Sequence, residues 1–121
     1  MRRRQQLSAR ALTFKLAAAL EQYEADVRAL VDNWLDRDLY RRLEEELKQL
    51  RIYCASLPRL SVSWMDVLVS RGRLMQALIR RGVQVPGPTR EARLLREHLA
   101  AVEGLRRRCL RMMGAQSVVL T

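Results

Sequence analysis

No glycine or proline interrupts the chain between Ser8 and Ser56, and this absence restricts the fold more than any other feature of the sequence. Leu, Ala, Glu, Arg and Gln dominate the segment, and all five are good helix formers. The chain has 121 residues, which is the size of one domain, and no strand-like alternation of apolar and polar residues occurs in it. We therefore expect a single all-α domain over residues 1–121.

Two apolar patterns run through this segment. The first advances in alternating steps of four and three, the spacing of a coiled-coil seam, through Leu16, Leu20, Tyr23, Val27, Leu30 and Trp34. The second comprises Leu39, Leu43, Leu47, Leu50, Cys54 and Leu57. Leu39, the start of the second pattern, follows five residues after Trp34, the end of the first. In one straight helix this spacing would place the two apolar stripes on different faces. A break near Asp36, a good N-cap residue, removes the conflict, so we predict helices over 8–35 and 38–56. The alternative is a single helix of about 48 residues, roughly 72 Å long.

Proline and serine mark the start of the third helix. Pro58 ends the preceding helical stretch, because proline disfavours helix at the residue before it. Ser61 or Ser63 begins the third helix, which we predict over about 64–81. Ser63 and Asp66 have the spacing of a capping box.

Two glycines bear on the last two helices. Gly72 lies in the middle of the third helix, and we interpret it as a point of close approach by a neighbouring helix, with a kink as the alternative. The fourth helix is predicted from its N-cap, Thr89, to Met113, with Gly114 placed to end it. Its predicted apolar seam comprises Leu95, Leu99, Val102, Leu105 or Arg106, Cys109 and Met113.

The expected architecture is a small helical bundle of three or four antiparallel helices, with a coiled-coil-like seam in the N-terminal half. We expect residues 1–7 to form a basic N-terminal arm and residues 115–121 to form a C-terminal tail. No apolar run approaches the roughly 20 residues that span a bilayer, which excludes a transmembrane helix. The chain has only two cysteines, and their wide spacing fits a reducing compartment, so we expect a cytoplasmic protein.

The net charge of +10 is unevenly distributed along the chain. Residues 1–20 carry five basic and no acidic groups, which gives +5. Residues 21–46 carry nine acidic and four basic groups, which gives −5, and residues 47–121 carry fourteen basic and four acidic groups, which gives +10. This segregation predicts that the acidic segment pairs with basic ones, either within the fold or between subunits.

Catalytic and metal-binding groups are scarce. The chain has one histidine, His98, and two cysteines, Cys54 and Cys109, which fall on predicted core stripes. Nucleophilic catalysis needs a base beside Ser or Cys, and a metal site needs a cluster of ligands; the sequence has neither pattern. Its five glycines form no phosphate-binding loop. We expect His98 to be structural or at the surface, both cysteines to be buried, and the protein to have no enzymatic activity, cofactor or metal.

Arginine side chains favour nucleic acid as one class of partner. Five of them lie roughly along one side of the fourth helix: Arg90, Arg93, Arg96, Arg107 and Arg111. Such a row would contact phosphates, and its binding would be sensitive to salt. A helix-turn-helix motif is disfavoured, because the connection of about seven residues before this helix exceeds the usual three or four. A basic regulator that binds DNA or RNA is therefore the alternative function.

Surplus apolar surface on the first two helices favours a protein partner more strongly. Apolar residues occupy more than one side of the first helix, and four short helices cannot cover all of them. We expect a protein partner and a homodimer, the latter through Leu20, Tyr23, Val27, Leu30 and Trp34. Membrane-surface binding is disfavoured by the acidic residues from Glu21 onward. The leading hypothesis is a non-enzymatic cytoplasmic adaptor, regulator or chaperone that acts through helix–helix contacts.

Overall fold

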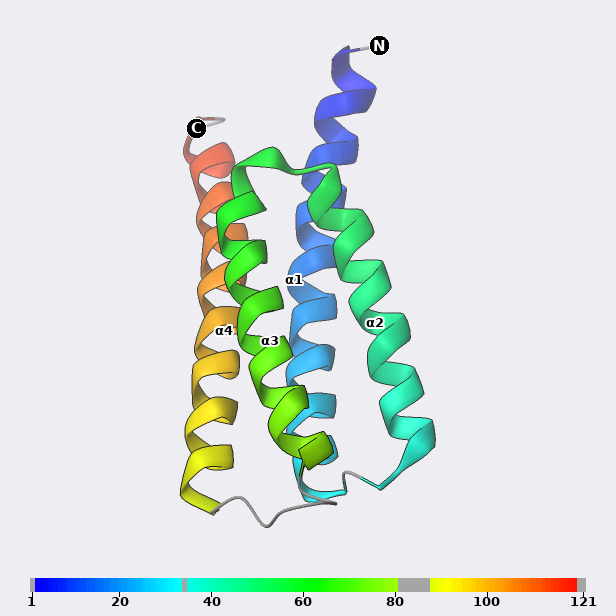
Figure 1. Ribbon diagram of the computed structural model, residues 1–121. Helices are drawn as coiled ribbons and strands as arrows, with labels where there is room; N and C mark the ends of the chain where they lie inside the picture. Colours follow the sequence, from blue (N-terminus) through cyan, green and yellow to red (C-terminus); the bar gives the residue numbers. More distant parts are fainter. Residues whose placement is uncertain (1, 34, 81–87, 120–121) are drawn as a thin grey trace.

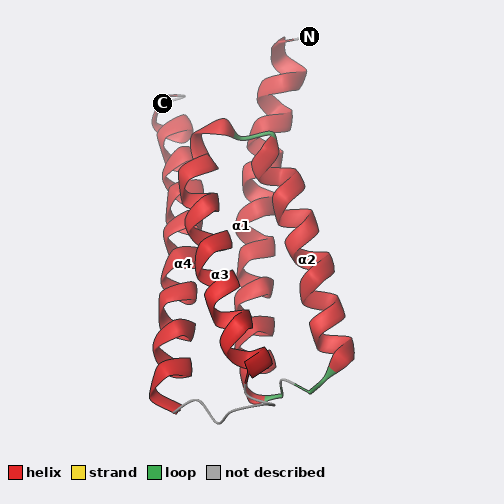
Figure 2. Cartoon of the chain, in the orientation of Figure 1, coloured by secondary structure: helices red, strands yellow, loops and turns green. Residues whose placement is uncertain are grey.

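Four helices form an up-down-up-down bundle (Figure 1). The computed structural model describes residues 2–33, 35–80 and 88–119, and side chains are described for residues 9–33, 35–80 and 90–114. The helices are α1 (Arg2–Asp32), α2 (Arg37–Ala55), α3 (Ser61–Arg80) and α4 (Pro88–Val119), and a short 3₁₀ helix, η1 (Pro58–Leu60), precedes α3. Figure 2 shows no strand among the described residues. The predicted all-α bundle is confirmed.

The predicted break between the first two helices is confirmed, and the single long helix is excluded. Asp36 is the N-cap of α2, and its Oδ1 accepts a hydrogen bond of 3.1 Å from the backbone N–H of Leu39. The cap satisfies one backbone donor that would otherwise have no partner in the first turn of α2. The chain can therefore reverse direction between Asp32 and Arg37, and α2 lies antiparallel to α1.

Both ends of the chain contain more helix than the sequence indicated. α1 begins at Arg2, so residues 2–7, expected as an arm, continue the first helix. α4 runs past Gly114 to Val119, so the helix also includes residues 115–119 of the expected tail. Glycine lowers helix propensity by only about 1 kcal/mol in a helix interior, so a single glycine does not force a helix to end.

Two features of α3 differ in part from the prediction. The helix begins at Ser61, one of the two predicted starts, so Ser63 lies inside its first turn and is no N-cap; the Ser63 hydroxyl instead accepts a 3.2 Å hydrogen bond from Arg108 on α4. Gly72 is exposed, and a Cβ atom built there would meet nothing within 4 Å. No neighbouring helix approaches it, so close packing within the bundle does not explain this glycine, and α3 continues as one helix through it.

The core draws side chains from all four helices. The α1 side chains of the predicted seam that are described, from Leu16 to Leu30, are buried. On α4 the buried stripe passes through Leu94, His98, Val102, Leu105 and Cys109. Four members of the predicted α4 seam, Leu99, Val102, Leu105 and Cys109, are therefore confirmed as buried, whereas Leu95 and Met113 are only half-buried. Cys54 and Cys109 are buried, as predicted.

The open surroundings of Gly72 give a stability prediction. Gly72→Ala should raise the free energy of unfolding by about 0.5–1 kcal/mol, because alanine loses less backbone entropy in a helix and here meets no obstacle. Urea denaturation measures the change. Gly104→Ala on α4 is the matched control, since Gly104 is also exposed with free space around it and should respond equally. Destabilisation by Gly72→Ala alone would show that something packs on this position.

Candidate functional site

The outer face of α3 exposes a row of large apolar side chains. Val62, Met65, Val69 and Ile79 are 69%, 55%, 59% and 67% exposed. Gly72 and Gln76 are also exposed and lie between Val69 and Ile79. The six positions therefore follow one another along the helix at intervals of three, four, three, four and three residues. This is the spacing of a face that packs against another helix, and it lies opposite the face that α3 turns to the core. We call these six positions the outer face of α3.

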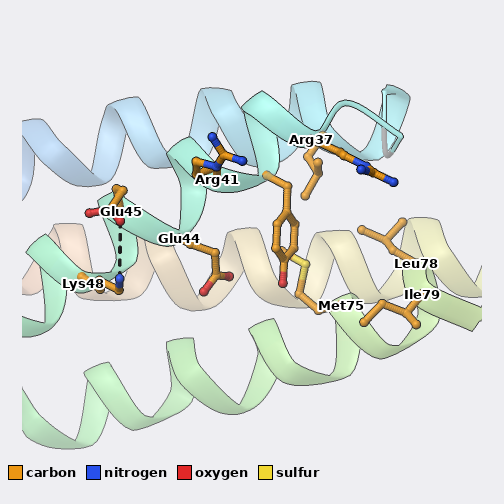
Figure 3. A pocket seen from close by; sticks show the side chains of 10 residues that line it. Arg37, Arg41, Glu44, Glu45, Lys48, Met75, Leu78 and Ile79 are labelled. Carbon is orange, nitrogen blue, oxygen red and sulfur yellow. Dashed lines mark hydrogen bonds and ion pairs between the residues drawn. The ribbon is translucent and has the colours of Figure 1, made fainter.

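A groove adjoins this face between α2 and α3. The two helices diverge toward the ends that carry Arg37 and Arg80, and the groove between them has a volume of about 720 Å³ (Figure 1). Its buried lining comes from Leu30 of α1 and from Met75 and Leu78 of α3. Figure 3 shows Met75, Leu78 and Ile79 on the side of α3 that faces α2. Ile79 therefore belongs both to the groove and to the outer face of α3.

The charged residues along the α2 side of the groove are only partly neutralised. Glu44 forms an ion pair with Arg71 of α3. Glu45 lies 3.4 Å from Lys48, a contact drawn in Figure 3. Two further arginines of this lining, Arg37 and Arg41, pair with no carboxylate in the part of the chain that the structure describes. The groove therefore has an apolar floor and a positively charged rim.

Inside the bundle, a polar network joins all four helices at one level. The Glu44–Arg71 ion pair connects α2 with α3, and the Arg71 guanidinium also lies close to the Tyr23 hydroxyl on α1. The Tyr23 hydroxyl lies 2.9 Å from Nε2 of His98 on α4. Nδ1 of His98 lies 2.8 Å from the hydroxyl of Ser70 on α3. Tyr23 and His98 are fully buried, so these bonds form away from water.

The partners of Ser70 determine the histidine tautomer. The Ser70 hydroxyl donates to the carbonyl oxygen of Val67 at 3.0 Å, so its oxygen is left to accept from Nδ1–H of His98. Nε2 is then the acceptor for the Tyr23 hydroxyl. Burial, with a smaller contribution from the charge of Arg71, lowers the pKa of His98 to about 4. The histidine is therefore neutral near pH 7, and both of its nitrogens are used in holding helices together.

A second polar cluster lies between α1 and α2. The carboxyl of Asp26 is nearly buried, 3.3 Å from the amide of Gln22 and 3.0 Å from Nη2 of Arg42. Burial and a hydrogen bond with Asp26 raise the pKa of Glu46 to about 7. Burial alone would raise the pKa of Asp26 as well, but hydrogen bonds with Glu46, Gln22 and Arg42 outweigh it and lower that pKa. As pH falls below about 7, the pair therefore takes up one proton, and Glu46 binds it before Asp26 does.

The predicted dimer seam lies in the interior of the bundle. Leu20, Tyr23 and Val27 are fully buried and Leu30 is 2% exposed, while Trp34 lies outside the described residues. This corrects the assignment of the four described residues to an interface, because other helices of the same chain already cover them. Exposed apolar side chains remain in the first half of the chain, at Phe14, Leu35 and Ile52, but the row with regular helical spacing lies on α3. The homodimer itself stays a prediction, and sedimentation at micromolar concentration tests it.

The segregated charges are paired within the fold. Glu44 of the acidic segment pairs with Arg71 of α3, and Glu21 lies 2.7 Å from Arg106 of α4. Of the two arrangements that the sequence left open, contacts within one chain therefore account for at least these two acidic side chains. Intersubunit pairing is not needed to satisfy them.

The five arginines that the sequence assigned to nucleic acid are all exposed on α4. Arg90, Arg93 and Arg96 line one surface hollow of about 380 Å³, whereas Arg107 and Arg111 lie further along the helix. Carboxylates partly neutralise the row, since Glu97 lies 4.0 Å from Arg93 and Glu103 lies 3.4 Å from Arg107. α3 and α4 lie side by side in antiparallel directions, which differs from the crossed helices of a helix-turn-helix motif (Figure 1).

Sequence reasoning missed the outer face of α3, although a signal was present. The spacing of Val62, Met65 and Val69 matches a helix-packing seam as well as the inward set of α3 does. A helix with two apolar faces either lies inside a larger core or offers one face to a partner. In a bundle of four helices, the second face of α3 remains exposed.

No protein-family model, no curated protein and no solved structure matches this chain. Among the described residues, no helix is both long and apolar enough to cross a membrane. In the same part of the chain, no three His, Cys, Asp or Glu side chains come together as a metal site would require.

Loss of the Tyr23 hydroxyl should destabilise the bundle. Tyr23→Phe leaves Nε2 of His98 buried without a donor, so we expect the free energy of unfolding to fall by about 1–3 kcal/mol in urea denaturation. Tyr53→Phe is the control, because Tyr53 is only half-buried and its hydroxyl makes no hydrogen bond within the described part of the chain. Equal effects of the two substitutions would show that the network does not stabilise the fold.

The buried titratable groups predict a flat dependence of stability on pH. An unfolded histidine binds a proton near pH 6.5, and folded His98 does so only near pH 4, so His98 destabilises the fold as pH falls through this window. Glu46 has the opposite effect: its folded carboxyl keeps a proton up to about pH 7 and its unfolded one only up to 4.5, so it stabilises the fold as pH falls. Between pH 4.5 and 6.5 the two effects oppose each other.

Glu46→Gln should therefore expose the contribution of His98. We expect the thermal midpoint of this variant to fall on acidification from pH 6.5 to 4.5, while that of the unmodified protein changes little. Glu45→Gln is the control, since Glu45 is an exposed neighbour on the same helix. The compensation is refuted if Glu46→Gln and Glu45→Gln have the same pH profile.

Proposed function

We propose that this chain is a non-enzymatic cytoplasmic protein that acts as an adaptor, regulator or chaperone through helix–helix contacts, with the outer face of α3 as its contact surface. The observation that carries the proposal is the row of exposed Val62, Met65, Val69 and Ile79 at coiled-coil spacing. Contiguous apolar surface rimmed by polar residues marks interaction sites on soluble proteins.

The position of Gly72 fits such a contact. It lies between Val69 and Ile79 on the outer face, is exposed, and has free space where a side chain would be. A glycine at this point lets the backbone of an incoming helix come close to α3, while the flanking apolar side chains pack around it. A partner would thereby account for a glycine that nothing in the bundle itself requires.

The buried polar groups favour a structural role over catalysis. Ser70 and His98 have the residue types of a nucleophile and a base, but the Ser70 hydroxyl already donates to Val67. His98 is fully buried and uses both ring nitrogens in contacts with other helices. Catalysis would require a substrate to reach these atoms and the base to be free. The two buried, free cysteines fit a reducing compartment such as the cytoplasm.

The arginines of α4 favour a nucleic-acid-binding regulator as the second candidate, since Arg90, Arg93 and Arg96 line one hollow. The two functions differ in their response to salt. Phosphate contacts by several arginines give an affinity that falls steeply with salt yet remains measurable near physiological ionic strength. Titration of labelled DNA and RNA between low and physiological salt separates them: complete loss of binding at physiological salt favours the protein-interaction function.

Site-specific crosslinking in the native cell tests the proposed surface. A photo-reactive amino acid at position 69 should crosslink to a discrete protein partner, and the same group at position 52 should not. The two positions are matched, because Val69 and Ile52 are 59% and 60% exposed. Met65→Glu should abolish the crosslink from position 69 without unfolding the bundle, because Met65 lies at the surface. Identical crosslinking patterns from positions 69 and 52 would refute the proposed surface.

A further inference from the structure

The groove between α2 and α3 is a second structural feature that calls for a partner. Its α2 lining extends from Arg37 to Lys48, which is about 17 Å along the helix axis or roughly three turns. α2 and α3 contact each other less than α1 and α2 or α3 and α4 do, so this side of the bundle is the least closed. The groove has the length and apolar floor that suit a short segment of helix.

The outer face of α3 leads into this groove. Ile79 ends the row of exposed apolar residues and also lines the groove, together with half-exposed Tyr40 of α2. An α-helix has 3.6 residues per turn, so side chains that repeat every seven residues form a stripe that drifts slowly around the helix axis. A partner helix that packs along the outer face therefore winds around α3. A helix lying on Val69 and Gln76 therefore reaches the groove at its next turn.

Charge identifies the kind of helix that fits. The carboxylates of the lining are already paired, Glu44 with Arg71 and Glu45 with Lys48. Arg37 and Arg41 remain without a carboxylate partner among the described residues. A partner with acidic side chains beside its apolar ones would supply the missing carboxylates. A second copy of this chain fits poorly, because each copy has a net charge of +10.

We propose that the groove between α2 and α3 binds the acidic end of an amphipathic helix from a partner protein. Apolar side chains of that helix, three and four residues apart, contact Ile79 and Tyr40, and its flanking carboxylates pair with Arg37 and Arg41. This inference rests on the proposed function, because it extends the same contact from the outer face of α3 into the groove. Beyond the proposed function, the inference specifies that the partner helix is acidic and that its end binds in the groove between α2 and α3.

Synthetic helices test the proposal in solution. The probe is an amphipathic peptide of about 18 residues with leucines at alternating steps of three and four and glutamates beside them. One control peptide carries lysine in place of each glutamate, and another has the glutamate peptide's composition in scrambled order. At physiological salt, fluorescence anisotropy should show the glutamate peptide binding at least about tenfold more tightly than either control. Equal binding of the scrambled peptide would overturn the proposal, because non-specific attraction to a basic protein would then suffice.

Two pairs of variants locate the binding site. Ile79→Glu should weaken binding of the glutamate peptide about tenfold or more, because a carboxylate then faces the apolar side of the peptide. Ile52→Glu is the matched control, since Ile52 is 60% exposed on α2 outside the groove and should leave binding unchanged. Arg37→Glu with Arg41→Glu should weaken binding more than Arg90→Glu with Arg96→Glu, which changes the net charge equally on α4. Equal effects within either pair would overturn the proposal.

The outcomes separate this inference from the proposed function. If the crosslink from position 69 is found but Ile79→Glu leaves peptide binding intact, the proposed function holds and the groove site is overturned. If peptide binding depends on Ile79 but position 69 gives no partner crosslink, the groove site holds and the wider contact surface is refuted. Sedimentation that shows a dimer abolished by Ile79→Glu would identify a second copy as the occupant and overturn the acidic partner.

Discussion

The arrangement of the bundle depends on one chain of polar contacts that passes through all four helices. Glu44, Arg71, Tyr23, His98 and Ser70 lie in sequence along it, and each successive contact links a different pair of helices. Apolar packing discriminates less sharply between helix registers, because apolar cores tolerate repacking by side chains of similar volume. Hydrogen bonds between fixed atoms in a dry interior do not tolerate it, because each lost partner leaves a buried polar group unsatisfied. The network therefore fixes the register of the helices as well as contributing to stability.

The same contacts explain how a strongly charged chain folds compactly. Carboxylates of α1 and α2 pair with arginines of α3 and α4, through Glu21 and Arg106 at one place and through Glu44 and Arg71 at another. Acidic groups are too few to neutralise all the arginines of the chain. Among the residues whose side chains are described, the arginines without a carboxylate partner lie at the surface, where water solvates them and where they give the molecule a field that attracts acidic partners.

Local signals in the sequence predicted much of the fold. Asp36 indicated the break between α1 and α2, because an N-cap acts through its own backbone neighbourhood. The apolar spacing of α1 predicted which side chains are buried, but it could not show that the chain itself covers them, since covering depends on where α2, α3 and α4 lie. The same limit applies to His98, whose partners Tyr23 and Ser70 are distant in sequence, and to the groove, which exists only because α2 and α3 diverge. The outer face of α3 was readable from spacing, whereas its exposure was not.

Two apolar faces on α3 also raise the question of how the folding chain chooses between them. Rotated about its axis by less than half a turn, the helix would offer Met65 and Val69 to the core in place of Trp64 and Leu74. That orientation would carry Ser70 and Arg71 away from His98 and Tyr23, and two polar side chains of the core would lose their partners. The adjacent Ser70 and Arg71 thus specify the rotational orientation of α3 about its axis. They determine which face turns inward and so which one remains outside.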